Sequence, residues 1–194
     1  MSNARQAQHP ISPTFTARWS PRAFDGRALT QEQMHSLFEA ARWTPSALNF
    51  QPWRFCYALA GTPPFEDFVG LLAETNQLWA RHAGALVAVL SQTTRTGTEG
   101  EDKPFSSHAF DAGAAWMNLA MQAHDMGLAT HAMGGFDAER ARQYLKPPAN
   151  VAINAFIAIG YRGDASALPE ALQARDQASD RAPQEQWVFE GPMA

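Results

Sequence analysis

The chain has 194 residues, of which 45% are hydrophobic and 18% are charged, with a net charge of −4 and one cysteine. This length suits a single domain, residues 1–194, with a substantial core. The scattered positive residues give no basic stripe for nucleic acid, and one cysteine excludes a disulfide framework or a cysteine-based metal site. We expect partners to be small molecules or protein. The low share of charged residues is compatible with a large apolar contact to a second copy of the chain.

The beginning of the chain predicts an arm followed by a well-marked helix. Residues 1–13 are expected to form a flexible N-terminal arm without an apolar signal core. Thr30 and Gln33 have the spacing of a capping box, and the helix that they open should end at Thr44, which precedes a proline. No run approaches the ~20 apolar residues needed to span a bilayer, so we expect a cytoplasmic protein with no membrane contact.

A strand, a helix, a strand and a long loop are expected next. Residues 54–60 alternate in character as strands do, with Cys56 as a buried strand residue, and 63–83 read as one helix opened by prolines. The all-apolar run 85–91 is typical of a central strand covered on both faces. Residues 92–107 have no periodicity, which indicates a lid or a partly disordered loop.

The second half predicts a long helix followed by shorter elements. Residues 108–127 form a helix that is apolar nearly all round, so it should lie at the centre of the fold or in a dimer interface. A strand is expected at 128–133, and a helix at 137–145 with Asp137 as its N-cap.

Residues 150–161 are the most strand-like stretch of the chain, and the tail follows them. The tail should contain a short helix at 169–175 and a strand-like segment at 184–191. A free apolar strand end would be an aggregation hazard, so the segment at 184–191 should pair with a sheet edge.

Several chemistries can be excluded from the motifs. The chain has no G-x-G-x-x-G, no G-x-x-x-x-G-K, no H-E-x-x-H and no G-x-S-x-G, which argues against a nucleotide loop, a zinc site and a serine nucleophile. The histidines have no metal-ligand spacing, and each is expected at the surface or satisfied in the core. If the protein is an enzyme, a cofactor should carry the chemistry.

Arg18, Ser20 and Arg22 alternate, so in an extended segment their side chains point the same way. Two guanidinium groups and a hydroxyl on one face suit a phosphate. Taken alone, this motif is also compatible with a solvated basic segment.

Several separated motifs resemble the FMN-dependent nitroreductase family. They are "RWSPRAF", "PSALNFQPW", "GLATHAMGGFD" and "AFIAIGY", in the family's order from about Arg18 to the tail, and the ending from Arg181 to Gly191 resembles the compact branch. The resemblance implies an α+β, three-layer fold with a mainly antiparallel central sheet flanked by helices. It also implies a homodimer with FMN at the subunit interface and a C-terminal segment swapped onto the partner.

The resemblance assigns the cofactor site residue by residue. Arg18 and Arg181 would hold the phosphate, Arg22 the N1 and O2 edge of the flavin, Asn76 its pyrimidine ring, and the turn at 134–135 would direct a backbone N–H at N5. The loop at 45–49 would reach a flavin held mainly by the other subunit. The implied cofactor-binding residues are Arg18, Trp19, Ser20, Arg22, Pro45, Ser46, Ala47, Asn49, Asn76, Gly134, Gly135 and Arg181. Ala47 stands where many relatives have serine, and Trp79 where some have lysine.

The implied activity is reduction of nitroaromatic, quinone or similar electrophilic molecules by NADH or NADPH in a ping-pong cycle. No side chain need act as catalytic acid or base, no metal is expected, and Phe50 and Phe105 would line the substrate pocket, with 92–107 as the lid. One alternative is a family relative that binds flavin without turnover, to store or destroy it. Another is an interaction module that binds no flavin.

Overall fold

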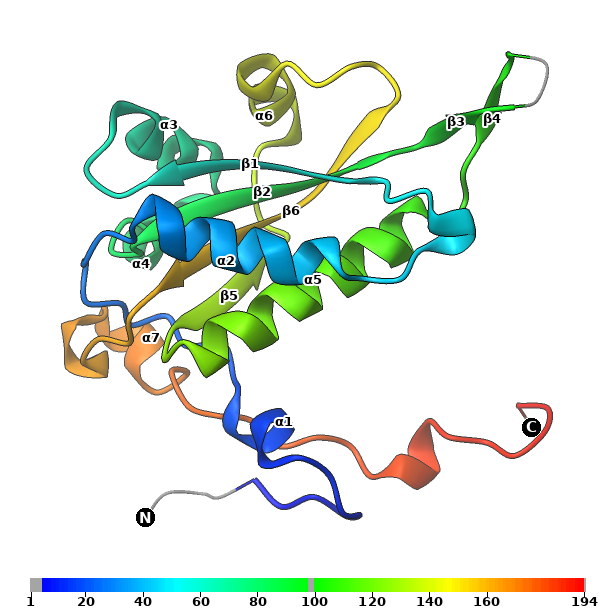
Figure 1. Ribbon diagram of the computed structural model, residues 1–194. Helices are drawn as coiled ribbons and strands as arrows, with labels where there is room; N and C mark the ends of the chain where they lie inside the picture. Colours follow the sequence, from blue (N-terminus) through cyan, green and yellow to red (C-terminus); the bar gives the residue numbers. More distant parts are fainter. Residues whose placement is uncertain (1–4, 98–99, 194) are drawn as a thin grey trace.

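The all-apolar run forms the centre of an antiparallel sheet. In the computed structural model, which describes residues 5–97 and 100–193, strand β2 (Ala85–Gln92) pairs with β1 (Trp53–Leu59) and β6 (Val151–Gly160). Strand β5 (Ala129–Met133) pairs with the other side of β6, which gives the order β1-β2-β6-β5 (Figure 1). Because β2 is inside the sheet and covered on both faces, every residue from 85 to 91 is buried, as the sequence predicted.

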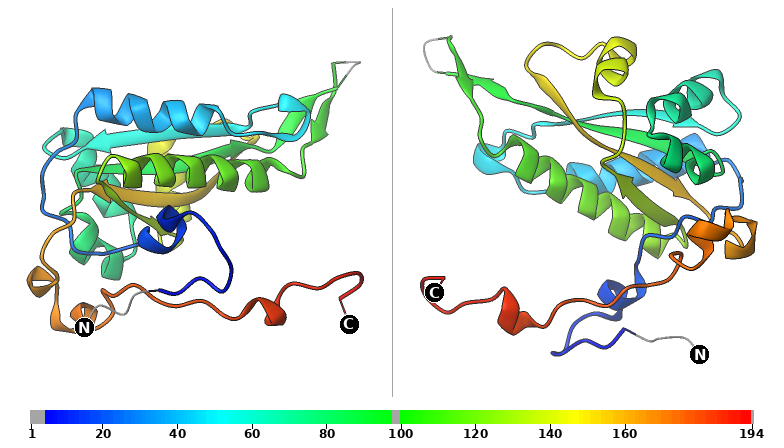
Figure 2. Two further views of the ribbon diagram at one scale, coloured as in Figure 1. Left: turned by 60° about the horizontal axis from the view of Figure 1, so that its bottom comes forward. Right: turned by 180° about the vertical axis from the view of Figure 1, so that it is seen from behind.

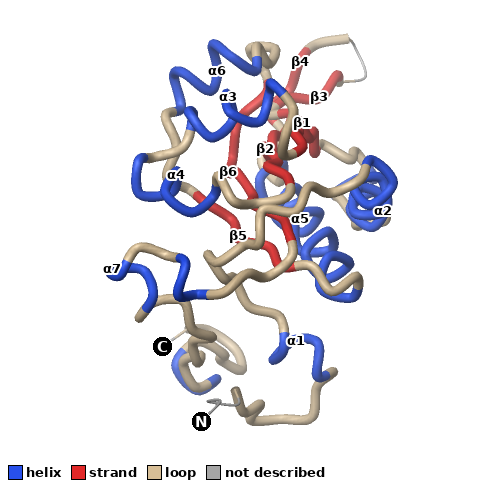
Figure 3. Tube along the Cα trace, turned by 90° about the vertical axis from the view of Figure 1, so that its left-hand side faces the viewer, coloured by secondary structure: helices blue, strands red, loops and turns tan. Residues whose placement is uncertain are grey.

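Helices cover both faces of this sheet in a three-layer α+β arrangement. Helices α2 (Gln31–Arg42) and α5 (His108–Asp125) lie on one face, as Figure 3 shows. The opposite face carries α3 (Pro63–Leu71), α4 (Glu74–Ala80) and α6 (Ala138–Leu145). The fold class expected from the resemblance is therefore correct.

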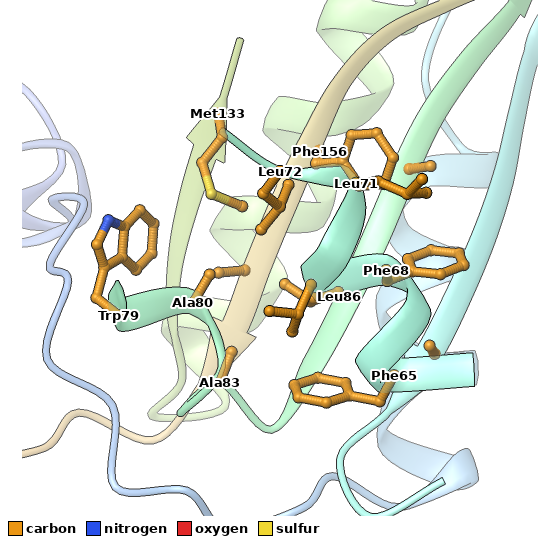
Figure 4. Close-up of a cluster of buried hydrophobic side chains, with 14 of the residues drawn as sticks. Phe65, Phe68, Leu71, Leu72, Trp79, Ala80, Ala83, Leu86, Met133 and Phe156 are labelled. Atoms are coloured by element: carbon orange, nitrogen blue, oxygen red, sulfur yellow. The ribbon is translucent and has the colours of Figure 1, made fainter. Parts of the chain in front are cut away.

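The sheet separates two hydrophobic clusters. On the α2 and α5 side, Met34, Leu37 and Leu119 are fully buried. Figure 4 shows the other cluster, in which Leu72, Trp79 and Met133 gather near β5 and Phe65 and Phe68 lie nearer β1. Burial of this apolar area on both faces is the main stabilising contribution to the domain.

Local signals set several element ends. Thr30 accepts from the backbone N–H of Gln33 while the Gln33 side chain accepts from Thr30, so the expected capping box is present. Asp137 caps α6 as expected. Gly127 follows α5 with a φ of 73°, a backbone conformation that glycine adopts without strain.

The expected single helix at 63–83 is wrong, because the chain forms two helices there. The break falls at Leu72 and Ala73: Leu72 makes a β-bridge with Phe136, and the Ala73 N–H donates to the carbonyl of Gly135 at 3.0 Å. The Asp137 N–H also donates to the carbonyl of Leu71 at 2.8 Å, so backbone groups on both sides of the break bond to the segment after β5. Tertiary pairing therefore overrides a continuous helical pattern.

The segment at 92–107 is not a structureless loop. It contains a short hairpin of β3 (Thr94–Thr96) and β4 (Asp102–Pro104), whose tip at 98–99 lies outside the described residues. The hairpin projects from the end of β2 (Figure 1). Only three residues on each side pair, which is too short a run to give a clear alternation in the sequence.

The N-terminal arm and the tail both lie below α5 (Figure 1), where the Gln184 N–H donates to the side-chain oxygen of Gln8 at 3.0 Å. A helix that the sequence did not indicate, α1 (Pro13–Ala17), follows the arm, whose residues 1–4 lie outside the described part. After the 3-10 turn η2 (Ala165–Ala167), the tail holds α7 (Glu170–Gln173) and a second 3-10 turn, η3 (Gln184–Gln186). Figure 2 shows the tail passing below α5 without joining the sheet.

The described part of the tail contains no strand, so the strand-like segment expected at 184–191 is not formed within one chain. Trp187 and Val188 are 58% and 52% exposed, since no strand of the same chain lies beside them. The swap onto a partner stays a prediction. No described helix has the length and apolar character to cross a membrane.

Cys56 lies on β1 and is partly buried against the cluster that includes Phe65 and Phe68. Burial raises the pKa of its thiol, so the residue stays protonated at neutral pH. This agrees with a structural strand residue rather than a reactive thiol.

Candidate functional site

The alternating segment at 18–22 forms no helix and lies beside β5, where the Pro21 carbonyl oxygen is 3.0 Å from Nδ1 of His131. The Arg18 guanidinium lies 3.4 Å from the Ser20 hydroxyl oxygen. Burial, followed by the nearby guanidinium groups of Arg5 and Arg181, lowers the pKa of Arg18. Cations brought together in this way repel one another, so an anion bound among them would be stabilised.

A cavity of about 280 Å3 lies beside this segment. Three guanidinium groups and one imidazole line it, and none of the described lining residues carries a carboxylate. Such a set of donors favours an anionic, phosphate-sized group. The lining residues are Trp19, Ser20, Arg22, His131, Arg175, Gln177, Ser179 and Arg181.

Four of these residues were missed by sequence reasoning, namely His131, Arg175, Gln177 and Ser179. Arg175 belongs to a polar tail with no motif, and His131 was expected to be a core or surface residue. Arg181 also lines a second cleft of about 580 Å3, together with Arg18, Phe15 and Met121. The two expected phosphate ligands, Arg18 and Arg181, therefore line the same cleft.

The turn after β5 contacts the start of α4. The Asn76 side-chain amide donates to the carbonyl of Gly135 at 3.0 Å. A Cβ on Gly135 would lie 3.0 Å from that amide nitrogen, whereas a Cβ on Gly134 would meet nothing within 4 Å. Gly135 therefore allows close packing of the turn on α4, and Gly134 leaves its surroundings open. Trp79 is 1% exposed and belongs to the core.

The loop after α2 has an unusual backbone. Leu48, Asn49 and Gln51 have positive φ values of 55°, 53° and 53°, a region that costs energy for residues other than glycine. The Ser46 hydroxyl accepts from the Gln51 N–H at 2.9 Å, which closes the loop. Pro45 and Ala47 are exposed beside it, and Trp53 is buried where the strand begins.

Two contacts attach this loop to α5. The Ala47 N–H donates to the buried carboxylate of Asp111 at 3.2 Å. The Asn118 amide donates to the hydroxyl oxygen of Thr44 at 2.8 Å. Asp111 was not singled out in the sequence, because a lone acid in an apolar helix has no motif. External anchors of this kind keep a strained loop in one conformation.

The rings of Phe50 and Phe105 pack in a tilted arrangement with centroids 4.5 Å apart. Phe105 is only 6% exposed, whereas Phe50 is partly exposed. Of the two expected pocket residues, Phe50 is the accessible one. Phe105 is buried next to it, directly after the hairpin.

The loop and the Arg18 segment lie at opposite ends of α5. Ala47 contacts Asp111 in the first turns of the helix, and Arg18 lines a small cavity with His124 and Gly127 at the other end. His124 lies thirteen positions after Asp111 along α5, which is ~20 Å at ~1.5 Å per residue. The structure thus brings Ser20, Arg22 and Arg181 to one cavity and Asn76 against the turn at 134–135, and it places the loop at 45–49 at the other end of α5.

The described residues offer no site for a serine nucleophile or for a metal ion. Ser91 lies 2.7 Å from a ring nitrogen of His108, but its side chain is fully buried and also accepts from Asn154. A nucleophile needs access to substrate, so this pair is structural. No group of three potential metal ligands occurs among the residues described.

A family model for the nitroreductase family matches residues 15–161. The chain belongs to the nitroreductase family. A solved structure described as an oxidoreductase containing FMN is 45% identical, with a TM-score of 0.97, covering 100% of this chain and 98% of the other.

Three further proteins have similar sequences or folds. An uncharacterized 15.4 kDa protein from Mycolicibacterium smegmatis is 36% identical over 134 residues, covering 68% of this chain and 86% of the relative. An NADH dehydrogenase from Thermus thermophilus is 28% identical over 189 residues, covering 80% and 90%. A putative nitroreductase in complex with FMN from Desulfovibrio desulfuricans has the same fold at 23% identity, with a TM-score of 0.72 and coverage of 97% and 100%.

Proposed function

We propose that this protein is an FMN-dependent NAD(P)H oxidoreductase that acts as a homodimer on nitroaromatic, quinone or similar electrophilic small molecules. The observation that carries the proposal is the cavity with three guanidinium groups and no carboxylate among its described lining residues. A family relative of 45% identity is described as containing FMN. The cofactor is thus consistent with both the donor set and the family.

The residues present fit FMN by their chemistry. Arg18 and Arg181 supply cations for the phosphate, and Ser20 supplies a hydroxyl beside them. Arg22 lines the same cavity as Ser20 and would place a cation near the electron-rich edge of the ring. Asn76 and the exposed turn at 134–135 would meet the polar edge of the ring, because Gly134 leaves room for close approach.

Bound FMN would supply hydride chemistry, accepting from NADH or NADPH and giving to the acceptor. The chain's own residues would bind and orient it, and Phe50 with the hairpin would exclude water from the pocket. Since one pocket would serve donor and acceptor in turn, we expect ping-pong kinetics. No side chain is assigned a proton-transfer role.

A homodimer would complete the site. The loop at 45–49 lies ~20 Å along α5 from Arg18 within one chain, too far for both to hold the same end of one cofactor. Phe110 and Met117 on α5 are 80% and 42% exposed, an apolar face that a second copy would cover. Ser46 and Asn49 would then reach the partner's cofactor.

The visible spectrum of the purified protein tests the proposal. We expect a yellow protein with flavin absorption bands that bleach when NADH or NADPH is added without oxygen and return when a quinone or nitroaromatic is added. A protein that is colourless after incubation with FMN and removal of the unbound flavin would refute the proposal. A yellow protein that neither NADH nor NADPH reduces would instead favour a flavin-binding relative without turnover.

A further inference from the structure

One peptide group in the candidate site is held at both of its polar atoms. The carbonyl oxygen of Pro21 lies 3.0 Å from Nδ1 of His131, and the N–H of Arg22, the other half of the same peptide, donates to Oδ1 of Asp176 at 2.5 Å. Because a carbonyl oxygen can only accept, His131 must donate from Nδ1. The histidine on β5 and the aspartate in the tail therefore hold the Pro21–Arg22 peptide from two sides. These two hydrogen bonds together are called the grip.

Both gripping side chains are fixed in turn. Asp176 is 4% exposed, and its other oxygen, Oδ2, is buried without a hydrogen-bond partner in the described residues. The His131 ring packs against Trp79 with centroids 4.7 Å apart. A buried carboxylate with one satisfied oxygen is costly to keep, which argues that its single strong bond has a purpose beyond stability.

The grip sets where the Arg22 side chain can go. Its backbone is held at the edge of the cation-lined cavity, and its Nη1 donates to the carbonyl of Arg175, the neighbour of Asp176, at 3.4 Å. Without the grip, a long side chain would sample many rotamers, each carrying the charge to a different place. A fixed cation lowers the energy of developing negative charge more than a mobile one.

We propose that His131 and Asp176 are positioning residues that hold the Pro21–Arg22 peptide so that the Arg22 guanidinium stays at the flavin. This inference rests on the proposed function and adds two residues to it. The hydrogen bond from Arg22 to Asp176 also fixes the tail. It joins 175–181 to the segment at 18–22, which keeps Arg175 and Arg181 beside the same cavity.

Amide exchange measured on the flavin-free protein tests the grip itself. Asp176→Ala removes the acceptor of the Arg22 N–H, whereas Asp176→Asn keeps an acceptor oxygen. We expect faster exchange of the Arg22 amide in the alanine variant and near-normal exchange in the asparagine variant. Asp164→Ala is the matched control, because it removes a carboxylate that accepts from a backbone N–H, that of Ser166, elsewhere in the tail. Unchanged protection of Arg22 in Asp176→Ala would overturn the proposal.

The second measurement asks whether the grip acts through Arg22. We expect Asp176→Ala to weaken FMN by about tenfold and to lower the flavin reduction potential. In an Arg22→Ala background Asp176→Ala should leave the reduction potential unchanged, since the cation to be positioned is then gone. An equal lowering of the potential in both backgrounds would overturn the proposal and leave Asp176 a structural residue. If Asp176→Ala fails to fold, His131→Leu against His131→Asn, which keeps a donor near the Nδ1 position, makes the same comparison.

The two hypotheses fail in different ways. A wild-type protein that binds no FMN would refute the proposed function and with it the task assigned to the grip. Normal FMN binding and potential in a folded Asp176→Ala variant would refute the grip alone.

Discussion

Asn76 and Ala73 both donate to the carbonyl oxygen of Gly135, each at 3.0 Å, one from its side chain and one from its backbone. One carbonyl thereby joins the break between α3 and α4 to the turn after β5. The side chain assigned to the ring of the flavin and the turn assigned to its N5 are thus parts of one rigid unit.

Gly135→Ala should disturb this unit. Its Cβ would lie 3.0 Å from the Asn76 amide nitrogen and 3.4 Å from the Ala73 Cβ, so we expect a loss of about 1–3 kcal/mol from overpacking. Thermal unfolding of the flavin-free protein measures it. Gly134→Ala is the control and should unfold at nearly the wild-type temperature, because nothing lies within 4 Å of its Cβ. Equal losses in both variants would contradict the model of the turn.

Arg18→Ala should weaken FMN but not riboflavin. It removes a charge-assisted contact of about 1.5–3 kcal/mol, which is about ten- to a hundredfold in affinity, and riboflavin lacks the phosphate that the contact serves. Fluorescence titration of both flavins measures the ratio. Arg42→Ala, which removes an exposed cation paired with Glu39, should change neither affinity. Equal loss of both flavins in Arg18→Ala would show that Arg18 is not a phosphate ligand.

His131 should make stability depend on pH. Burial is the main cause that lowers its pKa and Arg22 adds to it, while the Pro21 carbonyl and the Asp176 carboxylate oppose the change. The folded state therefore binds this proton less readily than the unfolded chain does. The contribution is fully present above the unfolded pKa of about 6.5 and is lost as the pH falls toward the lowered folded value.

Urea unfolding between pH 8 and pH 5 measures this dependence in the wild type and in His131→Asn. The two proteins share every other titrating group, so their difference reports His131. We expect the wild type to lose more stability than the variant over this range. Parallel curves would contradict a lowered pKa.

Two truncations should separate the roles of the tail. A chain ending at Gln186 loses the exposed Trp187, Val188 and Phe189 but keeps Arg181, so we expect a weaker dimer with most of the phosphate contact intact. A chain ending at Asp180 loses Arg181 as well and should also bind FMN less tightly. Sedimentation and flavin titration measure the two effects. A chain ending at Asp180 that stays dimeric, yellow and as heat-resistant as the full chain would show that the tail is dispensable.

Local signals were enough to predict most elements of the sheet and its helices. The cap at Thr30, the apolar run of β2 and the N-cap at Asp137 each act within a few residues, so the sequence carries them directly. The break at Leu72 could not be predicted, because the apolar spacing of Phe65, Phe68 and later residues continues through it. Its cause is a bridge to Phe136, which is 64 positions away.

The residues of the candidate site also divide into those with a local sequence signal and those without one. Arg18, Ser20 and Arg22 could be read together because they alternate within five residues, whereas the roles of the loop and the turn came only from the family resemblance. His131, Asp176 and Asp111 carry no local signal. Each acts on a backbone group more than 60 positions away, a relationship that exists only once the chain has folded.

The partly buried Cys56 gives this chain a practical advantage for measuring distances in solution. Because it is the sole cysteine of the sequence and burial raises the pKa of its thiol, an introduced surface cysteine would react with a maleimide spin label much faster at neutral pH. Glu190→Cys in the otherwise natural sequence would therefore place one label on the end of each tail. The distance between the unpaired electrons of the two spin labels, measured on such a dimer, would locate the two tails relative to one another without first removing a native thiol.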